Sequence, residues 1–267
     1  MTALTATSPA TTARRSARPI PLTRLVTVEL RKMFDTRSGL WLLVSIAVLS
    51  VVATGAVVVL APDDAVTYET FAAAIGLPVS VLLPLLAILA VTSEWSQRTG
   101  LTTFTLVPSR DRVIGAKALA TLVVGVVSMT VALAVGALGN VTGSALAGVH
   151  TVWDVSWSTV PQVVLGNLVG MAVGFTLAVG LRSSPAAVVG YFVASFVVSG
   201  ILVLLAQVRP GFEDLQPWID WNATQETLLD GSTDTAEEWA MLGSTTLIWI
   251  VVPLAVGLLL LRRSEVR

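Results

Sequence analysis

The sequence contains no cysteine and only one histidine, His150. Disulfide bridges, catalytic thiolates and Cys-ligated metal sites are therefore excluded, and one imidazole cannot build a multi-histidine metal site. A lone histidine in a connecting segment is usually solvated or hydrogen-bonded, so we assign His150 no catalytic role.

Charged residues are also scarce. Only 12% of the 267 residues are charged, whereas 54% are hydrophobic, and the mean hydropathy is +0.82. Soluble domains carry about 25% charged residues. The composition therefore predicts a chain whose main solvent is lipid.

Six apolar runs contain no charged residue, and each is long enough to cross a bilayer. A run of 19 to 23 residues reaches roughly 28 to 35 Å as a helix, which matches a hydrocarbon core of about 30 Å. Lipid cannot satisfy backbone polar groups, and a barrel would show shorter alternating segments, so helices are predicted. The sequence thus predicts an all-α integral membrane protein with six transmembrane helices, at about 40–61, 71–93, 118–139, 159–181, 185–207 and 243–261.

The segment before the first run differs from the rest of the chain. Residues 1–20 are mainly Thr, Ala, Ser, Pro and Arg, and too few are apolar to offset the entropy of ordering. We therefore expect a disordered cytoplasmic tail at 1–20 and a six-span membrane domain at 21–267.

Basic residues near span ends resist translocation, so their positions predict the orientation. The N-terminal segment, residues 94–117, Arg182 and the C-terminal segment hold 15 of the 16 basic residues, whereas residues 62–70, 140–158 and 208–242 hold 12 of the 17 acids. We therefore expect a multi-pass protein of the plasma membrane with both termini in the cytoplasm. The excess of arginine over lysine, with abundant Ala, Val and Gly, is typical of a GC-rich bacterial genome.

An amphipathic interfacial helix is predicted just before the first run. Leu22, Leu25, Val26, Leu30, Met33 and Phe34 recur at helical spacing, and Arg24, Arg31, Lys32 and Asp35 occupy much of the other side. Thr23 is the expected N-cap, and Gly39 the expected end. Such a helix should lie along the inner headgroups, either as an anchor alone or as a contact for a cytoplasmic partner. Its interfacial side chains are expected to include Arg24, Leu25, Arg31, Lys32 and Phe34.

Residues 94–117 form the longest connection on the predicted cytoplasmic face. A simple reversal needs far fewer residues, so a structured insertion is predicted, divided into two short helices at Pro108 and Ser109. Its pattern is an acidic residue, Glu94, at the end of the second span, then Arg98-Thr99-Gly100, a Thr-rich apolar stretch, Pro108-Ser109-Arg110, and Lys117 at the entry of the third span.

This pattern, with six spans and a preceding amphipathic helix, resembles the membrane subunit of type-2 ABC exporters. The resemblance implies a homo- or heterodimer of permeases that couples to separate cytoplasmic ATP-binding subunits, with the loop acting as a coupling helix. The candidate interface residues that it implies are Glu94, Trp95, Gln97, Arg98, Thr99, Arg110 and Arg112.

The chain itself lacks a phosphate-binding loop. Such a loop ends in Gly-Lys-Ser/Thr, whereas Lys32 follows Arg31 and Lys117 follows Ala116. We therefore expect no enzymatic activity and no cofactor in this chain; ATP and Mg²⁺ would belong to the partner ATPase. Membrane lipid is an expected partner, and nucleic acid is not.

Two further patterns predict packing and an outer cap. Gly166, Gly170 and Gly174 line one face of the fourth span, which predicts close approach of another span or of a second protomer. Trp218 and Trp221, within the acidic stretch 208–242, predict a partly inserted cap or an interfacial anchor. The resemblance implies short re-entrant helices there, and Thr235 and Glu238 match a capping box.

Other function classes are less favoured by the sequence. The six runs contain no ionisable residue, which disfavours ion-coupled transport. Glu237 and Glu238 lack the histidines that an intramembrane metalloprotease would need. A non-transporting membrane assembly or regulatory protein stays open as the alternative.

Overall fold

The computed structural model describes residues 20–96 and 110–263. The predicted disordered tail therefore lies outside the described residues except for Ile20. The two described ranges consist of helices and their connections, without a β-sheet. Within them, six helical segments are long and apolar enough to cross a membrane, which confirms the predicted fold class: Arg37–Leu60, Tyr68–Ser96, Asp111–Ala147, Thr159–Leu181, Ser184–Val208 and Ala236–Leu261.

The first four spans are single helices, and the last two are interrupted. The former are α2 (Arg37–Leu60), α3 (Tyr68–Ser96), α5 (Arg110–Ala147) and α6 (Thr159–Leu181). The fifth joins α7 (Ser184–Phe192) to α8 (Ser199–Val208) through the π-helical stretch η2 (Val193–Val198), and the sixth joins α11 (Ala236–Thr246) to α12 (Val252–Arg263) through η3 (Leu247–Val251).

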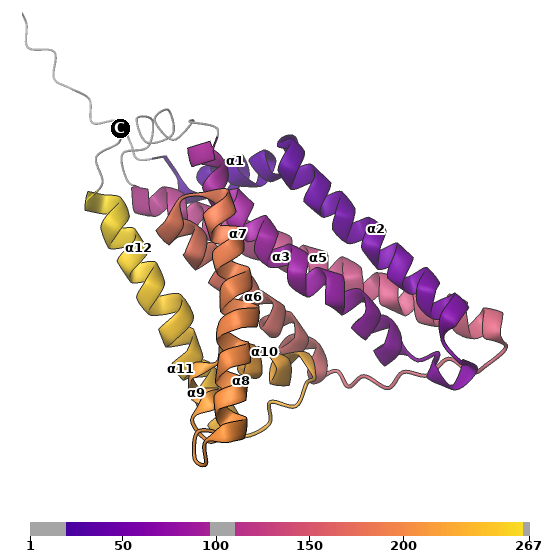
Figure 1. The fold of residues 1–267 in the computed structure, drawn as a ribbon. Helices are drawn as coiled ribbons and strands as arrows, with labels where there is room; N and C mark the ends of the chain where they lie inside the picture. Colours follow the sequence, from indigo (N-terminus) through magenta and orange to yellow (C-terminus); the bar gives the residue numbers. More distant parts are fainter. Residues whose placement is uncertain (1–19, 97–109, 264–267) are drawn as a thin grey trace, which may run out of the picture.

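The short elements lie outside the spans. Helix α1 (Leu22–Asp35) precedes the first span, η1 (Asp63–Ala65) joins the first span to the second, and α9 (Gln216–Ile219) and α10 (Trp221–Leu229) lie between the fifth and the sixth. Figure 1 shows α1 and the final turns of α12 at one end of the bundle, the α1 end, and α9 and α10 near the other, the α10 end.

Helices α3, α5 and α11 begin before or end after the apolar runs predicted for them. Helix α3 continues past residue 93 to Ser96, and α5 runs from Arg110 to Ala147, so residues 140–147 are helical rather than part of a loop. At 1.5 Å per residue α5 reaches roughly 57 Å, well beyond a hydrocarbon core of about 30 Å. The helices that contain the second and third apolar runs therefore also carry Glu94 and Lys117, each one residue outside the run itself.

The turn between α1 and α2 also differs from the prediction. Helix α1 begins at Leu22 with Pro21 as its N-cap, so Thr23 is not the cap, and the helix ends at Asp35. Thr36 is extended, and its Oγ1 accepts the backbone N–H of Gly39 at 3.3 Å. A Cβ on Gly39 would lie 2.2 Å from the Met33 carbonyl oxygen. Position 39 therefore requires glycine, because the first turn of α2 lies close to the Met33 carbonyl. The bend between α1 and α2 is at Thr36.

Helices α3 and α6 form the centre of the bundle. The buried share of the most apolar part of each span measures how central it is. This share is 61% in α6 and 44% in α3, but only 17% in α2 and 17% in the sixth span. Figure 1 shows α2 and α12 on opposite flanks of the central helices. The exposed surface of α2 is apolar, with Val51, Val52 and Val59 more than half exposed, as expected for a helix solvated by lipid.

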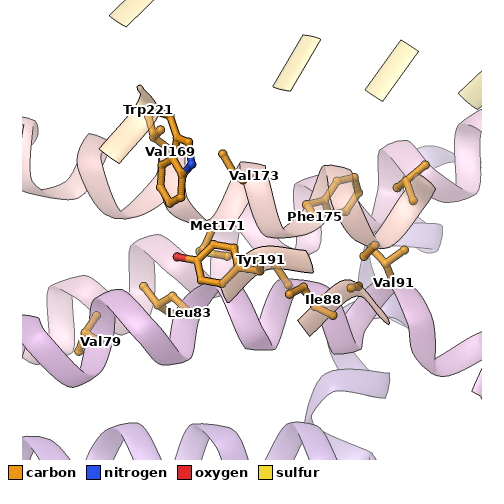
Figure 2. Close-up of a cluster of buried hydrophobic side chains, with 14 of the residues drawn as sticks. Val79, Leu83, Ile88, Val91, Val169, Met171, Val173, Phe175, Tyr191 and Trp221 are labelled. Atoms are coloured by element: carbon orange, nitrogen blue, oxygen red, sulfur yellow. The ribbon is translucent and has the colours of Figure 1, made fainter. Parts of the chain in front are cut away.

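The core fills the space between α3 and α6 with interlocking side chains. Figure 2 shows Val79, Leu83 and Ile88 of α3 in one cluster with Val169 and Val173 of α6. The Tyr191 ring lies in the middle of this cluster, and Trp221 lies at one edge. All of these side chains are buried. Their contacts hold α3 against α6 along much of its length.

The glycine ridge of α6 packs against this chain's own helices. A Cβ on Gly174 would lie 2.9 Å from the carbonyl oxygen of Pro84 in α3, and one on Gly166 would lie 3.1 Å from the Cβ of Leu228 in α10. A Cβ on Gly170 would meet the Gln225 amide at 2.7 Å. The ridge is therefore used within the protomer, by α3 and α10.

We expect Gly174→Ala to destabilise the protein by about 1–3 kcal/mol, because the Pro84 carbonyl is backbone and cannot move aside as a side chain can. Gly180→Ala is the matched control in the same helix, since its Cβ would meet nothing within 4 Å. It should be neutral or gain up to about 1 kcal/mol from helix propensity. Thermal unfolding of the purified variants in detergent measures both, and equal effects would contradict the packing.

The absence of cysteine makes the predicted orientation directly testable, because single cysteines report without background. Trp157 is 91% exposed on the loop before α6, and Ser96 is exposed at the end of α3. In intact cells a membrane-impermeant maleimide should label Trp157→Cys, and should label Ser96→Cys only after permeabilisation. The reverse pattern would overturn the predicted orientation.

Candidate functional site

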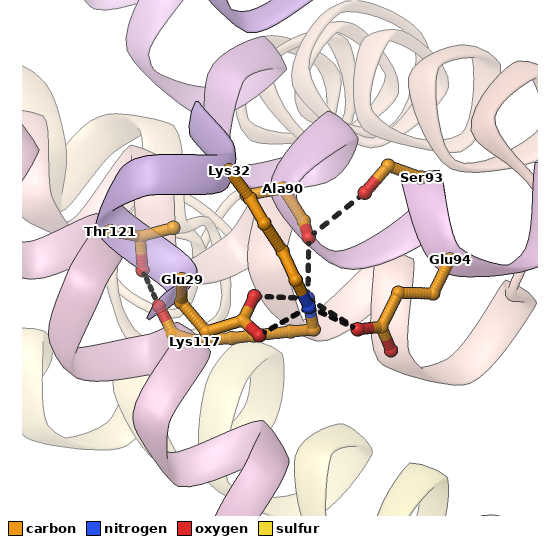
Figure 3. Close-up of polar contacts among 7 residues, drawn as sticks. All are labelled: Glu29, Lys32, Ala90, Ser93, Glu94, Lys117 and Thr121. Atoms are coloured by element: carbon orange, nitrogen blue, oxygen red, sulfur yellow. Dashed lines mark hydrogen bonds and ion pairs between the residues drawn. The ribbon is translucent and has the colours of Figure 1, made fainter. Parts of the chain in front are cut away.

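Four charged side chains from three helices meet at the α1 end of the bundle (Figure 3). Helix α1 contributes Glu29 and Lys32, α3 contributes Glu94, and α5 contributes Lys117. The Lys117 ammonium lies 2.6 Å from Glu29 Oε2 and 3.3 Å from Glu94 Oε1. The Lys32 ammonium lies 2.7 Å from Glu29 Oε1 and 3.0 Å from Glu94 Oε1. Each ammonium group therefore bridges both carboxylates; we call these four residues the charge cluster.

The cluster is buried and electrically neutral. The side chains of Glu29, Glu94 and Lys117 are 9%, 3% and 1% exposed, whereas that of Lys32 is 39% exposed. Burying a single ion costs several kcal/mol even after relaxation, so such groups are tolerated only with well-placed opposite charges. Lys117 also donates to the Ala90 carbonyl oxygen at 3.1 Å, which fixes it against α3. The two positive and two negative charges balance.

Lys32 lies outside the spans, on α1. Burial lowers its pKa, but its hydrogen bond to Glu29 and the charges of Glu29 and Glu94 outweigh burial and raise the pKa above the ordinary value of 10.5. Lys32 is therefore charged at physiological pH. Because the pKa is raised in the folded state, its contribution to stability is complete below 10.5 and is lost only as the pH rises through the raised value.

The sequence pattern of α1 contains the signal for Glu29, although the prediction missed it. Glu29 follows Leu25 by four residues and precedes Met33 by four, so it lies in the apolar stripe rather than on the polar face. A carboxylate in that position needs a buried cation. Its partner Lys117 lies 88 residues away in the sequence, at the predicted entry to the third span. At that separation no local pattern indicates that the two side chains meet.

The other residues of α1 divide between the two faces. Arg24 and Arg31 are exposed, Leu25 is half-buried, and Phe34 is 53% exposed. Lys32 was predicted for the polar face but turns inward, because Glu29 and Glu94 both attract its ammonium group.

The expected coupling residues lie on both sides of an undescribed segment. Gln97, Arg98 and Thr99 lie outside the described residues. Glu94 and Trp95 belong to the last turns of α3, and Arg110 and Arg112 to the first turn of α5, so the ends of the predicted insertion belong to the long helices. Glu94 is not on an exposed surface, since its carboxylate faces the cluster, and Trp95 is half-buried. Arg112 donates to the Ile20 carbonyl oxygen at 2.6 Å, which ties the start of α1 to α5.

A cavity of about 300 Å³ borders the cluster and is lined by all four of its charged residues together with residues of α1, α2, α3 and α5. The lining includes Ser93 and Thr36, and the apolar residues Met33 and Leu86. The cluster is thus placed where α1 meets the bundle, within one turn of the end of α3 and two turns of the start of α5.

The expected outer cap is a pair of short helices packed onto the bundle. Trp221, at the start of α10, is only 1% exposed and belongs to the core beside Tyr191, whereas Trp218 in α9 is half-buried. Asp220 joins the two helices: its carboxylate accepts the backbone N–H of Asn222 at 3.1 Å and the Ser199 hydroxyl from the fifth span. Trp221 is therefore a core residue rather than a surface anchor.

Helix α11 begins at the capping box predicted from the sequence. The Thr235 hydroxyl accepts the backbone N–H of Glu238, and the Glu238 carboxylate accepts that of Thr235, so the capping box is confirmed. The helix therefore begins at Ala236, ahead of the apolar run predicted from residue 243.

No protein-family model matches the chain, and no curated protein is significantly similar to it. The likeness to exporter permeases thus depends on the residue pattern around 94–117 and on the order of the helices.

We expect Lys117→Met to destabilise the protein by about 3–5 kcal/mol, because two buried carboxylates would then share only Lys32. Adding Glu94→Gln should recover part of this loss, since Glu29 and Lys32 remain as a balanced pair. Arg24→Met, on the exposed face of α1, is the control and should change stability by no more than about 0.5 kcal/mol. Thermal unfolding in detergent measures all three; strictly additive losses for the double variant would show that the four charges do not act as a unit.

Proposed function

We propose that the protein is the transmembrane subunit of an ATP-driven exporter, which works as a dimer with two cytoplasmic ATP-binding subunits. The observation that carries the proposal is the charge cluster. It fastens α1 to α3 and α5 where these helices lead into residues 97–109, the middle of the segment that resembles a coupling element.

The cluster supports a mechanical role because it joins the elements that would receive a force. Residues 97–109 are covalently continuous with α3 and α5, and Glu94 and Lys117 tie both helices to α1. A displacement of that segment would move the three helices as one rigid body, which is a common way to carry a conformational change. Without the cluster, α1 would be held on the bundle only by its apolar contacts and by the Arg112–Ile20 hydrogen bond.

The central packing supports transmission beyond the cluster. Helix α3 contacts α6 closely at Pro84 and Gly174, so a shift of α3 would be felt by α6. Pro78 and Pro84 remove backbone donors from α3, and the π-helical stretches η2 and η3 interrupt the last two spans. Such interruptions are preferred positions for bending.

The second candidate is a non-transporting membrane assembly or regulatory protein. It would use the same six spans and the same cluster as a static brace for α1. The two functions differ in one respect: only the exporter subunit needs a nucleotide-hydrolysing partner whose rate responds to residues 97–109.

The test is to purify the protein from membranes of its native host in mild detergent, identify any bound ATP-binding subunit, and reconstitute the complex in proteoliposomes. Arg98→Ala should lower ATP hydrolysis by about tenfold, the effect of losing a contact worth about 1.4 kcal/mol. The control is Arg209→Ala, the same substitution in the connection after α8. It should leave the rate unchanged.

Two results would contradict the proposal. One is a complex that retains no ATP-hydrolysing subunit although the protein is folded and membrane-inserted. The other is an ATPase rate that is the same with and without the membrane subunit. Either result favours the assembly protein.

A further inference from the structure

A second cavity lies at the α10 end of the bundle, away from the charge cluster. Its volume is about 520 Å³, and it is enclosed by α3, α5 and α6, with residues 154–156 and 229–230 at one end. Cavities of roughly 300 to 1,000 Å³ are typical of small-molecule sites. Its place in the fold is set by the first turns of α3 and α6, which supply Tyr68 and Thr159 to its lining.

The body of this cavity is apolar. Ile75 and Val79 of α3, Met129 of α5 and Val163 of α6 face it, and all four are buried or half-buried. Such a wall favours a hydrophobic occupant, because removing apolar surface from water or from headgroups is favourable. It gives no specificity for a particular shape.

One buried polar group lines the same cavity. Asn167 is 1% exposed; its Nδ2 donates to the Val163 carbonyl oxygen at 2.9 Å, and its Oδ1 has no hydrogen-bond partner among the residues that the structure describes. A buried carbonyl acceptor without a donor loses the hydrogen bonds that it made to water. The amide therefore calls for a donor from an occupant of the cavity.

Three acidic side chains lie at the rim of the same cavity. Glu69, Asp154 and Asp230 line the cavity and are exposed, and no basic residue lines it. The Asp154 carboxylate accepts the backbone N–H of Glu69 at 2.9 Å, which holds the 154–156 segment against the first turn of α3. Several carboxylates around an opening bordered by apolar walls concentrate cations there.

We propose that this cavity binds an amphipathic organic cation, with its cationic group among Glu69, Asp154 and Asp230, its apolar body between α3, α5 and α6, and an N–H or O–H donor directed to Asn167 Oδ1. That such a compound is also exported rests on the proposed function. Binding itself needs no ATPase and no transport.

The test uses the purified full-length chain in detergent, without nucleotide or partner. Ethidium is the probe, because it is a fluorescent cation with an apolar ring system and amine donors, and its fluorescence anisotropy reports binding. Tetraphenylphosphonium is the comparison probe, since it is an apolar cation without a donor. Its binding is measured by competition against ethidium.

Saturable ethidium binding that weakens at high salt is the expected result. Asn167→Leu should weaken ethidium binding about tenfold, the size expected for one lost hydrogen bond in a buried site, and should leave tetraphenylphosphonium unaffected. Glu69→Gln combined with Asp154→Asn should weaken both probes. Asp63→Asn, an exposed acid in η1 that does not line the cavity, is the matched control and should change neither.

The rim variants alter exposed side chains, so the proposal stays testable if Asn167→Leu does not fold. Binding no greater than that of empty micelles would overturn it. So would an unchanged ethidium affinity in Asn167→Leu, which would mean that water supplies the donor, or equal affinity for an uncharged dye of similar size, which would mean a lipid-filled gap. Loss of ATPase coupling in Arg98→Ala with intact ethidium binding would separate this site from the proposed function.

Discussion

Ions cannot be buried singly in a bundle that is mostly surrounded by lipid, and the charge cluster satisfies this constraint by combining two carboxylates with two ammonium groups. Glu29 and Lys32 on α1 would be costly against apolar helices without Glu94 and Lys117, and the reverse is equally true. Since the four residues come from three helices, each carboxylate meets both ammonium groups only when α1, α3 and α5 are assembled together. The charge cluster thus adds an electrostatic tie to the apolar contacts of Met33 with α3 and α5, and both hold α1 on the bundle.

Helix α3 connects the two polar regions of the molecule. Its last turns carry Glu94 into the charge cluster, and its first turn carries Glu69 to the rim of the larger cavity. Between them, Pro84 lies against Gly174 of α6, where the backbones approach too closely for a side chain. Pro78 and Pro84, which lack backbone donors, are the positions between these two regions where α3 bends most easily.

The short helices α9 and α10 give the α10 end a defined structure. Trp221 fills the core, Gln225 donates to the Gly166 carbonyl oxygen at 2.9 Å, and Asp220 accepts from Ser199 in the fifth span. These contacts join the segment between the fifth and sixth spans to α6 and α8. The cavity lined by Asn167 is therefore bordered at Leu229 by the end of a packed helix.

The sequence by itself determined the features that depend on local composition: six long apolar helices, the capping box at Thr235, and an amphipathic helix before the first span. The length of an apolar run and the spacing of its side chains depend only on neighbouring residues, so the sequence alone reveals them. Only the tertiary structure decided how far α3 and α5 extend, that Glu29 and Lys117 meet, that the glycine ridge faces α3 and α10, and that Trp221 is buried. In a sequence, a charged residue is taken as the end of a span, because burying a charge costs free energy. In the folded protein, oppositely charged partners far away along the chain offset that cost.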